Sequence, residues 1–435
     1  MRHLSDVFYL LTGLALSPLV LYRALRHGRY RKGWGHRFGH ISRPSPQDPC
    51  IWLHAVSVGE TNAAQGIIGQ LQQRYPRHDV VVSTTTDTGY ARAKQLFSDT
   101  CTVIYFPLDI SWVMSRAFRQ LNPCLCLLME LEVWPNFMHT AQQQQVPVVV
   151  VNGRISDNSY KSYKRFRALL RNAFDRLTLA LVQTAEYAER FQDIGCHPDR
   201  VVVTGSIKYD TAEIVDSIEG AAEIAQQLCL AEDQPIWVAG GTGDGEEPLI
   251  LEAYRDLLNL DAGTNLRLIV VPRKPERFDT VAQMIEQAGF TVQRYSPIKT
   301  GQVQATPDPK AVILGDTMGD LRKFYSLASV SFVGRSLVPM GGSDMMEVAA
   351  LGKPTLFGPF TQNFRQTVRA LLAGHGAIEV ADKDELRLAV LRCLQDVGYA
   401  QQLGRNGQQV IRENQGATEK TLTHLAKILP TENNG

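Results

Sequence analysis

The sequence lacks several patterns that mark particular classes of protein. Its seven cysteines are odd in number and no two form a C-x-x-C pair, so we expect reduced, mostly buried thiols in a cytoplasmic setting. The ten histidines are dispersed, and we predict no metal site and no cofactor. Neither the G-x-G-x-x-G fingerprint nor the Walker A pattern occurs, which argues against dinucleotides and triphosphates. A net charge of +1 argues against broad nucleic-acid binding.

An apolar run distinguishes the N-terminus. Residues 7–22 contain no charge, and basic residues follow at Arg23, Arg26, Arg29, Arg31, Lys32 and Arg37. A full membrane span needs roughly 20 apolar residues, so this run, which Pro18 interrupts, is short. A signal peptide would carry its basic residues before the apolar run. We therefore predict that residues 1–40 form an uncleaved membrane anchor with a basic cytoplasmic flank. An amphipathic packing helix of the first domain is the alternative.

The rest of the chain has the composition and alternation of an α/β protein. Its 435 residues favour two domains, and 44% hydrophobic with 20% charged residues is typical of globular proteins. Near-continuous Val runs, such as residues 148–151, alternate with helical stretches and indicate parallel sheets covered on both faces. We predict two doubly wound Rossmann-like domains, 41–212 and 234–435, joined by a polar helical linker, 213–233. Ligands of such sheets bind beyond the carboxyl ends of the strands, here in a cleft that the two domains face.

The stretch 339–354 is the most informative part of the second half. Gly341, Gly342 and Ser343 precede a helical pattern. Ser343 suits the N-cap position, and free backbone N–H groups after paired glycines favour an anion such as a phosphate. Glu347 lies about one turn into the predicted helix, where it could reach a ribose hydroxyl. An ordinary capped helix after a glycine turn is the alternative.

Two further strand ends in this half suit a nucleotide. Arg273 and Lys274 follow one apolar run, where a fixed cation can balance the charge of a phosphate. Met318 and Gly319 follow another run and offer an apolar wall and close backbone approach for a base. A plain surface turn explains each of these features singly. Together they indicate one binding site.

Charged residues also follow strands in the first half. Glu60 stands at the start of a predicted helix, whose N-terminus would hold a general base ionised; a capping glutamate is the alternative. Glu130 and Glu132 end another strand and suggest acid–base or charge-stabilising work. Lys208 follows the last strand, where it either stabilises an anionic donor or is a solvated loop lysine. The basic, aromatic-containing stretch 153–171 suits an anionic lipid surface or an ordinary solvated helix face.

Taken in order, these motifs resemble the 3-deoxy-D-manno-octulosonic acid (Kdo) transferases of lipopolysaccharide biosynthesis. The resemblance covers essentially the whole chain. It rests on the N-terminal anchor and on HAVSVGE, MELEVWPN, NGRIS, VTGSIKYD, GEE, PRKPERF, DTMGDL, FVGRSLVPMGG and ALGKPTLFGP. It implies a GT-B fold and an inverting, metal-independent transfer of Kdo from CMP-Kdo to the anionic lipid A precursor, lipid IVA. It also implies the inner membrane as the location, with the catalytic domains on its cytoplasmic face.

The resemblance assigns roles to particular residues. It implies that Glu60 is the proton acceptor, which takes the proton of a sugar hydroxyl as that oxygen attacks the anomeric carbon. It implies that Glu130 and Lys208 stabilise the transition state. The CMP contacts that it implies are Pro272, Arg273, Met318, Gly319, Asp320, Asp344, Met345, Met346 and Glu347. The donor has a single phosphate, so neither a triphosphate loop nor a metal cluster is needed.

Departures from the family pattern lie in the donor half. The usual Gly-Gly-His-Asn-Pro is replaced at 341–345, and Asp344 adds a negative charge beside the expected phosphate. Lys274 replaces a histidine and could be the compensating cation, Gly243 replaces another histidine, and Arg335 replaces a glycine. Two alternatives therefore stay open: a diverged GT-B transferase that uses another nucleotide sugar on a membrane lipid, and an inactive membrane-surface binding protein. The sequence also leaves open the number of sugars transferred, the acceptor lipid and the oligomeric state.

Overall fold

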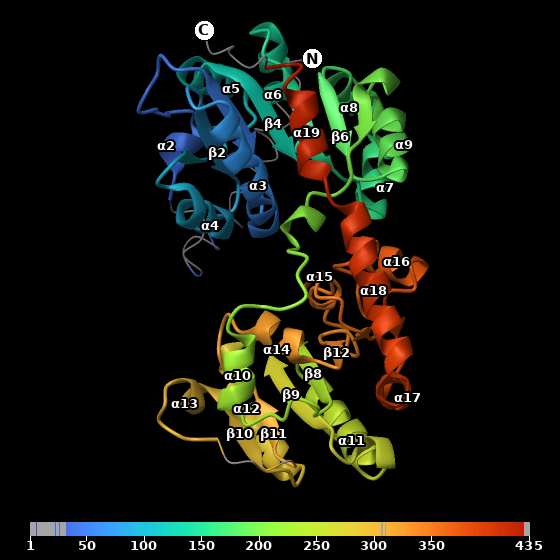
Figure 1. Cartoon of the computed structure of the whole chain (residues 1–435). Helices are drawn as coiled ribbons and strands as arrows, with labels where there is room; N and C mark the ends of the chain where they lie inside the picture. Colours follow the sequence, from blue (N-terminus) through green and yellow to red (C-terminus); the bar gives the residue numbers. More distant parts are fainter. Residues whose placement is uncertain are drawn as a thin grey trace. The chain divides into compact units, whose positions relative to one another are not determined.

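The chain folds into two α/β units, which the computed structural model describes at residues 6, 22, 26, 32–305, 308 and 310–429 (Figure 1). The first unit comprises Met1–Thr211 with Gln415–Gly435, and the second comprises Ala212–Asn414. No helix in the described part of the chain has both the length and the apolar character needed to cross a bilayer. The apolar run of the predicted anchor lies outside the described residues, apart from Tyr22.

A parallel sheet of seven strands forms the centre of the first unit, in the order β3-β2-β1-β4-β5-β6-β7. The strands are β1 (Cys50–His54), β2 (Asp79–Thr84), β3 (Thr102–Tyr105), β4 (Pro123–Met129), β5 (Val148–Gly153), β6 (Leu179–Val182) and β7 (Val201–Val203). Every residue of β1 and β5 is buried, as expected for central strands covered on both faces. The strand order reverses between β1 and β4, which is the switch point where doubly wound sheets bind ligands.

Helices cover both faces of this sheet. They are α2 (Trp34–Arg37), α3 (Val58–Arg74), α4 (Asp87–Phe97), α5 (Ser111–Leu121), α6 (Pro135–Gln143), α7 (Asp157–Arg165), α8 (Arg167–Phe174), α9 (Ala185–Ile194) and α19 (Ala417–Leu425). Apolar side chains of α3, α4 and α19 form one core with the sheet, and those of α5, α6, α8 and α9 form the other. Hydroxyl side chains cap α3, α4, α7 and α9 at their N-termini and so satisfy backbone N–H groups there.

The second unit repeats this architecture with a parallel sheet in the order β10-β11-β9-β8-β12-β13-β14. Its strands are β8 (Ile236–Thr242), β9 (Arg267–Pro272), β10 (Val292–Arg294), β11 (Val312–Leu314), β12 (Val330–Val333), β13 (Thr355–Phe357) and β14 (Ile378–Glu379). Its helices are α10 (Ala221–Gln227), α11 (Glu246–Leu258), α12 (Phe278–Gln287), α13 (Tyr295–Lys299), α14 (Leu321–Leu327), α15 (Met346–Ala349), α16 (Arg365–Ala373), α17 (Lys383–Gln395) and α18 (Val397–Asn414). The prediction of two doubly wound α/β halves is confirmed.

The structure divides the chain differently from the predicted boundaries at 213–233 and 234–435. Helix α19 belongs to the first unit, because Leu422 and Leu425 pack in the same core as Ile67 and Ile68 of α3. Within the predicted linker, α10 packs against α14 of the second unit. Both differences have one cause: an amphipathic pattern shows which face of a helix is buried but not which core receives it.

The seven cysteines are free thiols, and four of them are buried. Burial raises the pKa of Cys50 and of Cys196 to about 12, so both stay protonated at neutral pH and are poor nucleophiles. Cys229 is exposed. The four buried thiols belong to the packed interior.

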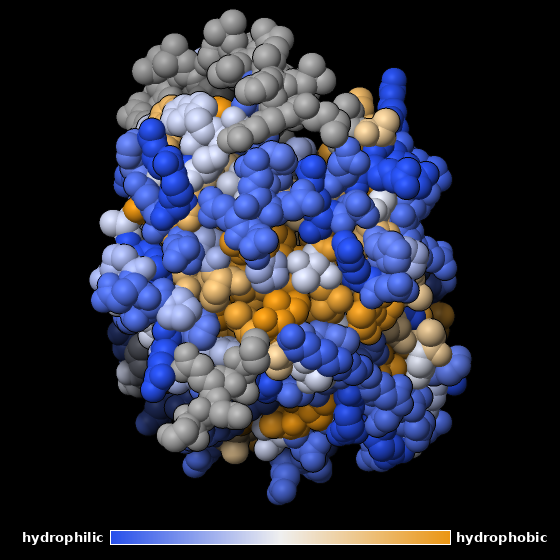
Figure 2. All heavy atoms as spheres, turned by 90° about the horizontal axis from the view of Figure 1, so that it is seen from above, coloured by the Kyte–Doolittle hydropathy of each residue, from blue (hydrophilic) through white to orange (hydrophobic). Residues whose placement is uncertain are grey.

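The face of the molecule drawn in Figure 2 is mostly polar, with local apolar features. Hydrophilic side chains make up most of the face in Figure 2, and apolar side chains gather near its centre. In the first unit, the exposed rings of Trp34, Phe38 and Trp112 stack on one another with centroid distances of 5.8 and 6.2 Å. The guanidinium of Arg116 lies 5.2 Å from the centre of the Trp112 ring. Exposed aromatic rings beside cations are typical of surfaces that meet a membrane interface.

Candidate active site

Glu60 lies near the carboxyl end of β1, next to the switch point of the first sheet. Its carboxylate accepts hydrogen bonds of 2.9 Å from the backbone N–H of Val56 and from the hydroxyl of Ser57. Ser57 is the N-cap of α3 and in turn accepts from the backbone N–H of Glu60 at 3.4 Å. The sequence S-x-x-E thus forms a capping arrangement that holds the carboxylate in one place.

Burial sets the protonation chemistry of Glu60. It raises the pKa of this carboxyl above the usual value of 4.5, and the negative charge of Glu130 raises it further, whereas the hydrogen bonds from Val56 and Ser57 lower it. The helix N-terminus was expected simply to hold this group ionised, but the pKa is displaced upward. A carboxylate with a raised pKa is a stronger proton acceptor once it is ionised, which is what general-base catalysis near neutral pH requires.

Glu130 follows β4 directly, on the other side of the switch point. Its backbone has φ of 54°, in the left-handed region that disfavours residues with a side chain. Its backbone N–H donates to the carbonyl of Val151 at 3.0 Å, and its carboxylate lies 3.8 Å from the guanidinium of Arg154. Strained backbone of this kind persists where surrounding contacts fix it, and it is common at functional sites.

His54, which is buried, and Glu132, which is half-buried, lie close together at the same edge of the sheet. The ring Nδ1 of His54 lies 3.0 Å from the carbonyl oxygen of Ser83, so this nitrogen is the donor. The ring Nε2 has no hydrogen-bond partner among the described residues and lies 3.9 Å from the Glu132 carboxylate. Burial lowers the pKa of His54 to about 3, so the ring is neutral. Burial also raises the pKa of Glu132 to about 7, and the charges of Glu60 and Glu130 add to this effect.

We expect Glu132→Gln to stabilise the protein at pH 8 by about 1–3 kcal/mol. The folded-state pKa of Glu132 is raised, so the folded protein binds the proton more tightly and loses stability as the pH rises from 4.5 towards 7. The amide lacks this penalty and can still accept from the indole N–H of Trp134. Denaturant unfolding at pH 4 and pH 8 measures the difference in the free energy of unfolding between the variant and the wild type. This difference should vanish at pH 4. A gain of the same size at both pH values would show that charge is not its cause.

Lys208 follows β7, just before the short 3₁₀ helix η2 (Tyr209–Thr211), which packs against α3. The backbone N–H of Ile207 donates to the side chain of Asn152 at 3.2 Å, and this bond fixes the segment to β5. Within the described part of the chain, the Lys208 ammonium forms no hydrogen bond or ion pair. It is a half-buried cation on the segment that contacts the helix of Glu60.

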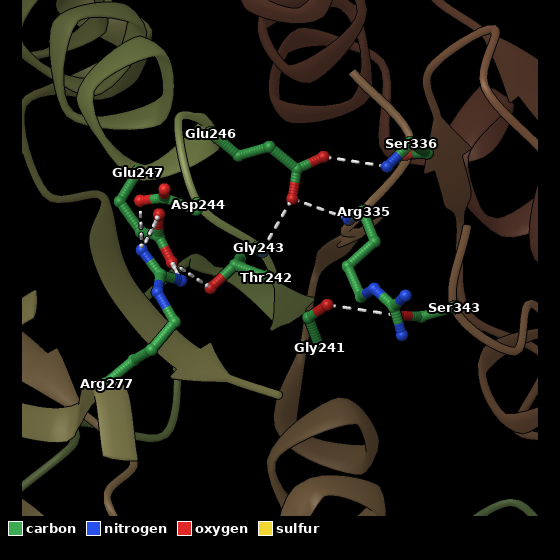
Figure 3. A network of polar contacts seen from close by, with 10 residues as sticks. All are labelled: Gly241, Thr242, Gly243, Asp244, Glu246, Glu247, Arg277, Arg335, Ser336 and Ser343. Carbon is green, nitrogen blue, oxygen red and sulfur yellow. Dashed lines mark hydrogen bonds and ion pairs between the residues drawn. The ribbon is translucent and has the colours of Figure 1, made fainter. Parts of the chain in front are cut away.

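In the second unit, the carboxylate of Glu246 ties the end of β8 to the loop after β12 (Figure 3). Glu246 is completely buried at the start of α11. One of its oxygens accepts from the backbone N–H groups of Gly243 and Arg335, and the other accepts from Ser336 at 2.7 Å and Leu337 at 2.9 Å. One carboxylate therefore satisfies four backbone donors. It positions two loops at the switch point of the second sheet, where β8 and β12 are neighbours.

Glu247 makes a second buried contact beside it. It accepts from the hydroxyl of Thr242 at 2.8 Å and forms a two-pronged ion pair with Arg277. The guanidinium of Arg277 also lies 3.3 Å from the carboxylate of Asp244, in the loop after β8 (Figure 3). The bidentate geometry is the strong form of the arginine–carboxylate pair, so this group holds the loop after β8 against the turn after β9.

Gly341, Gly342 and Ser343 form a turn opposite Arg335, but the prediction that Ser343 caps the following helix is wrong. Its hydroxyl donates to the carbonyl of Gly241 at 2.9 Å instead. The backbone N–H of Met346 donates to the Asp344 carboxylate at 2.9 Å. The helix that follows, α15, is a single turn whose residues Met346 and Val348 point into the core. Its N-terminus is therefore a weaker anion site than the sequence pattern indicated.

A basic residue, Arg273, and an acidic residue, Glu347, lie near the carboxyl ends of the strands of the second sheet. Pro272 ends β9 and Arg273 follows it, exposed, with its backbone N–H donating to Thr242 at 3.0 Å. Within the described residues, the Arg273 guanidinium forms no hydrogen bond or ion pair. Burial raises the pKa of Glu347 to about 7; the charge of Asp344 adds to this, and those of Arg273 and Arg322 oppose it.

In the turn after β11, the side chain of Met318 is exposed and that of Asp320 is buried. The side chain of Met318 is 67% exposed, and Gly319 has φ of 89°, which a glycine adopts without strain. Asp320 is buried, and its carboxylate binds the ammonium groups of Lys299 and Lys323 and the hydroxyl of Thr317. Burial raises the pKa of Asp320, but these contacts outweigh it and hold the pKa below its ordinary value. This carboxylate anchors the turn and leaves Met318 free to contact a ligand.

The predicted site residues are divided between the two units, with Glu60, Glu130 and Lys208 in the first and the others in the second. The sequence did not predict the structural contacts of Glu246, Glu247, Arg277 and His54. For Glu246 and Glu247 a signal was present, because this acidic pair directly follows a glycine-rich strand end. In the described part of the chain, no group of three or more His, Cys, Asp and Glu side chains is placed to hold a metal ion.

Comparison with known proteins identifies related sequences along almost the whole chain. Residues 32–211 match the family described as 3-deoxy-D-manno-octulosonic-acid transferase (kdotransferase). A 3-deoxy-D-manno-octulosonic acid transferase of Haemophilus influenzae is 34% identical over 433 residues, which are 97% of this chain and 98% of that protein. The one from Bordetella pertussis is 31% identical over 96% of this chain and 98% of its own length. A glycosyltransferase structure from Rickettsia africae, 13% identical, covers 89% of this chain and 100% of its own with a TM-score of 0.58, which shows a shared fold.

Proposed function

The chain belongs to the 3-deoxy-D-manno-octulosonic-acid transferase family, and we propose that it is an inverting, metal-independent glycosyltransferase that moves Kdo from CMP-Kdo to lipid IVA in lipopolysaccharide biosynthesis. The two doubly wound units have the GT-B architecture. The observation that carries the proposal is the carboxylate of Glu60, held at a helix N-terminus beside Glu130 at the switch point of the first sheet.

In the proposed reaction, Glu60 removes the proton of a sugar hydroxyl of the acceptor. The freed oxygen attacks the anomeric carbon of Kdo from the face opposite the phosphate, and the bond from that carbon to the phosphate oxygen breaks. The electron pair leaves with CMP, so the configuration at the anomeric carbon inverts. Two features support this role: the raised pKa of Glu60, and the hydrogen bonds that fix its orientation.

Glu130 and Lys208 suit charge stabilisation in this reaction. Positive charge develops on the sugar in the transition state of glycosyl transfer, and a fixed carboxylate stabilises it. Negative charge develops on the leaving phosphate, for which Lys208 and Arg273 offer cations that lack an ion-pair partner within the described residues.

The proposed nucleotide site lies at the carboxyl edge of the second sheet. The proposed CMP contacts are Pro272, Arg273, Met318, Gly319, Asp320 and the stretch from Asp344 to Glu347. Support comes from the exposure of Met318, from the Arg273 guanidinium, which has no ion-pair partner among the described residues, and from the switch-point position of the neighbouring loops. Glu347, with its raised pKa, remains the proposed partner of a ribose hydroxyl.

We also propose that the protein acts at the cytoplasmic face of the inner membrane, where its lipid acceptor would be. The uncharged run at residues 7–22 and the basic residues after it support this location. The exposed rings of Trp34, Phe38 and Trp112, with the Arg116 guanidinium over one of them, also suit a lipid headgroup region.

We expect the purified protein to release CMP from CMP-Kdo only when the tetra-acylated lipid A precursor is present. The dependence follows because the acceptor oxygen is the attacking group. Detection of free CMP together with the mass of the lipid product measures the transfer. Release from a different nucleotide sugar, with none from CMP-Kdo, would favour a diverged transferase. Lipid binding without any release would favour a membrane-surface binding protein.

A further inference from the structure

Arg335 occupies a backbone position that suits glycine far better than arginine. It is the second residue after β12, and its φ is 60°, in the left-handed region. Its backbone is held on both sides: the N–H donates to the buried carboxylate of Glu246, and the carbonyl accepts from Gly342 at 2.7 Å. These bonds fix the strained conformation and therefore fix the direction in which the side chain leaves the loop.

In the view of Figure 3, the side chain of Arg335 extends from its loop in the direction of Ser343. It donates to the carbonyl of Met340 at 3.1 Å, and it has no carboxylate partner among the described residues. The nearby carboxylates of Asp244 and Glu247 are bound instead by Arg277, in the turn after β9. A cation without a counter-charge, in a fixed place, is suited to an anion from outside the protein.

Gly243 makes room for this side chain. A Cβ atom at position 243 would lie 2.4 Å from the sulfur of Met340 and 3.0 Å from Cγ of Arg335. The first distance is shorter than real Cβ atoms show and the second is tight, so a side chain at position 243 would require Met340 to move and Arg335 to shift slightly. The end of β8 therefore has no side chain at this point, and Arg335 and Met340 fill the space from the neighbouring strand's loop.

The position of Arg335 in the sheet indicates which ligand it faces. Its loop follows β12, Gly243 follows β8, and β9 lies on the other side of β8. The strand order reverses between β8 and β12, where the ligands of doubly wound sheets bind. Arg273, which follows β9, and Arg335 thus stand after the two strands that flank β8.

We propose that Arg335 is a donor-binding residue whose guanidinium holds an anionic group of the nucleotide sugar. This inference rests on the proposed function, because CMP-Kdo offers two such groups, the phosphate and the sugar carboxylate. Both are planar or tetrahedral oxyanions that a guanidinium binds through two N–H donors. Arg335 adds a specific anion contact to the proposed site, on the opposite side of β8 from Arg273.

The test compares Arg335→Gly with the wild type by calorimetric titration with CMP and by the KM for CMP-Kdo. Glycine suits φ of 60°, so this variant keeps the loop and should unfold no earlier than the wild type. We expect the dissociation constant of CMP to rise roughly 10- to 100-fold if the guanidinium holds the phosphate. An unchanged CMP affinity with a similar rise in KM for CMP-Kdo would assign the contact to the carboxylate. Arg335→Lys should recover part of the loss because it keeps the charge.

His375→Gly is the matched control, since His375 is exposed and also has positive φ, 51°, away from the proposed site. It should leave both constants unchanged. If Arg335→Gly also leaves CMP affinity and KM unchanged while the wild type binds and reacts, the inference is wrong and the proposed function stands. If the wild type itself neither binds CMP nor uses CMP-Kdo, the proposed function fails and this inference fails with it.

Discussion

Glu60→Gln is expected to lower kcat about 10²- to 10⁴-fold, the usual contribution of a general base, while the affinity for CMP stays the same. The amide keeps the shape of the side chain and can still accept the backbone hydrogen bond from Val56, so α3 should begin as before. What it loses is the ability to take a proton from the acceptor hydroxyl. In the wild type, the acid limb of kcat against pH should lie above the ordinary glutamate value of 4.5, because burial and Glu130 raise the pKa of Glu60.

Glu385→Gln separates the chemical role of Glu60 from its structural one. In α17, Asp382 is the N-cap and the Glu385 carboxylate accepts from the backbone N–H of Ala381 at 2.7 Å, four residues earlier. Glu60 and Val56 have the same spacing, so both substitutions replace a carboxylate acceptor by an amide in the same kind of local contact. The control variant should keep full activity. A loss below about tenfold for Glu60→Gln would move the role of base to Glu130 or Glu132.

Glu246→Gln is expected to destabilise the second unit by about 3–5 kcal/mol, although the two side chains have the same shape. The buried carboxylate accepts from four backbone N–H groups, two at each oxygen. An amide has only one oxygen, so its NH₂ group would face two of these donors and leave them without a partner. The loops after β8 and β12 should loosen together, and CMP binding should weaken as a result.

Hydrogen exchange gives the sharpest measurement, because it reports on the two loops directly. We expect faster exchange at residues 243 and 335–337 in Glu246→Gln and little change in the first unit. Glu223→Gln, the same substitution at an exposed first-turn position of α10, should change neither exchange nor stability. Unchanged protection at 335–337 would mean that Glu246 does not hold the two loops together.

The sequence predicted the local features of this protein well. Val-rich runs separated by helical stretches predicted two parallel sheets, since strands buried on both faces have few polar residues. The sequence also predicted which charged residues follow strands, because the change from apolar to polar residues marks the end of a strand. These residues are Glu60, Glu130, Lys208 and Arg273. Caps such as Ser57 follow from spacing alone, because the partner lies three residues away.

Contacts between distant residues could not be read in this way. Ser343 has the side chain of an N-cap, but the carbonyl of Gly241, about a hundred residues earlier in the chain, takes its hydroxyl. Glu246 meets its donors at 335–337 only because β8 and β12 become neighbours. The raised pKa of Glu60 depends on burial and on Glu130, which no local pattern contains.

The sequence by itself thus determined the fold class and the family, and with them the positions of the candidate catalytic residues. Only the tertiary structure decided that α19 returns to the first unit, that the Arg335 guanidinium has no carboxylate partner among the described residues, and which carboxylates have raised pKa values. The physical reason is the range of the interactions. Strand and helix formation follow side-chain periodicity over a few residues, whereas core assignment, hydrogen-bond partners and desolvation depend on which segments pack together.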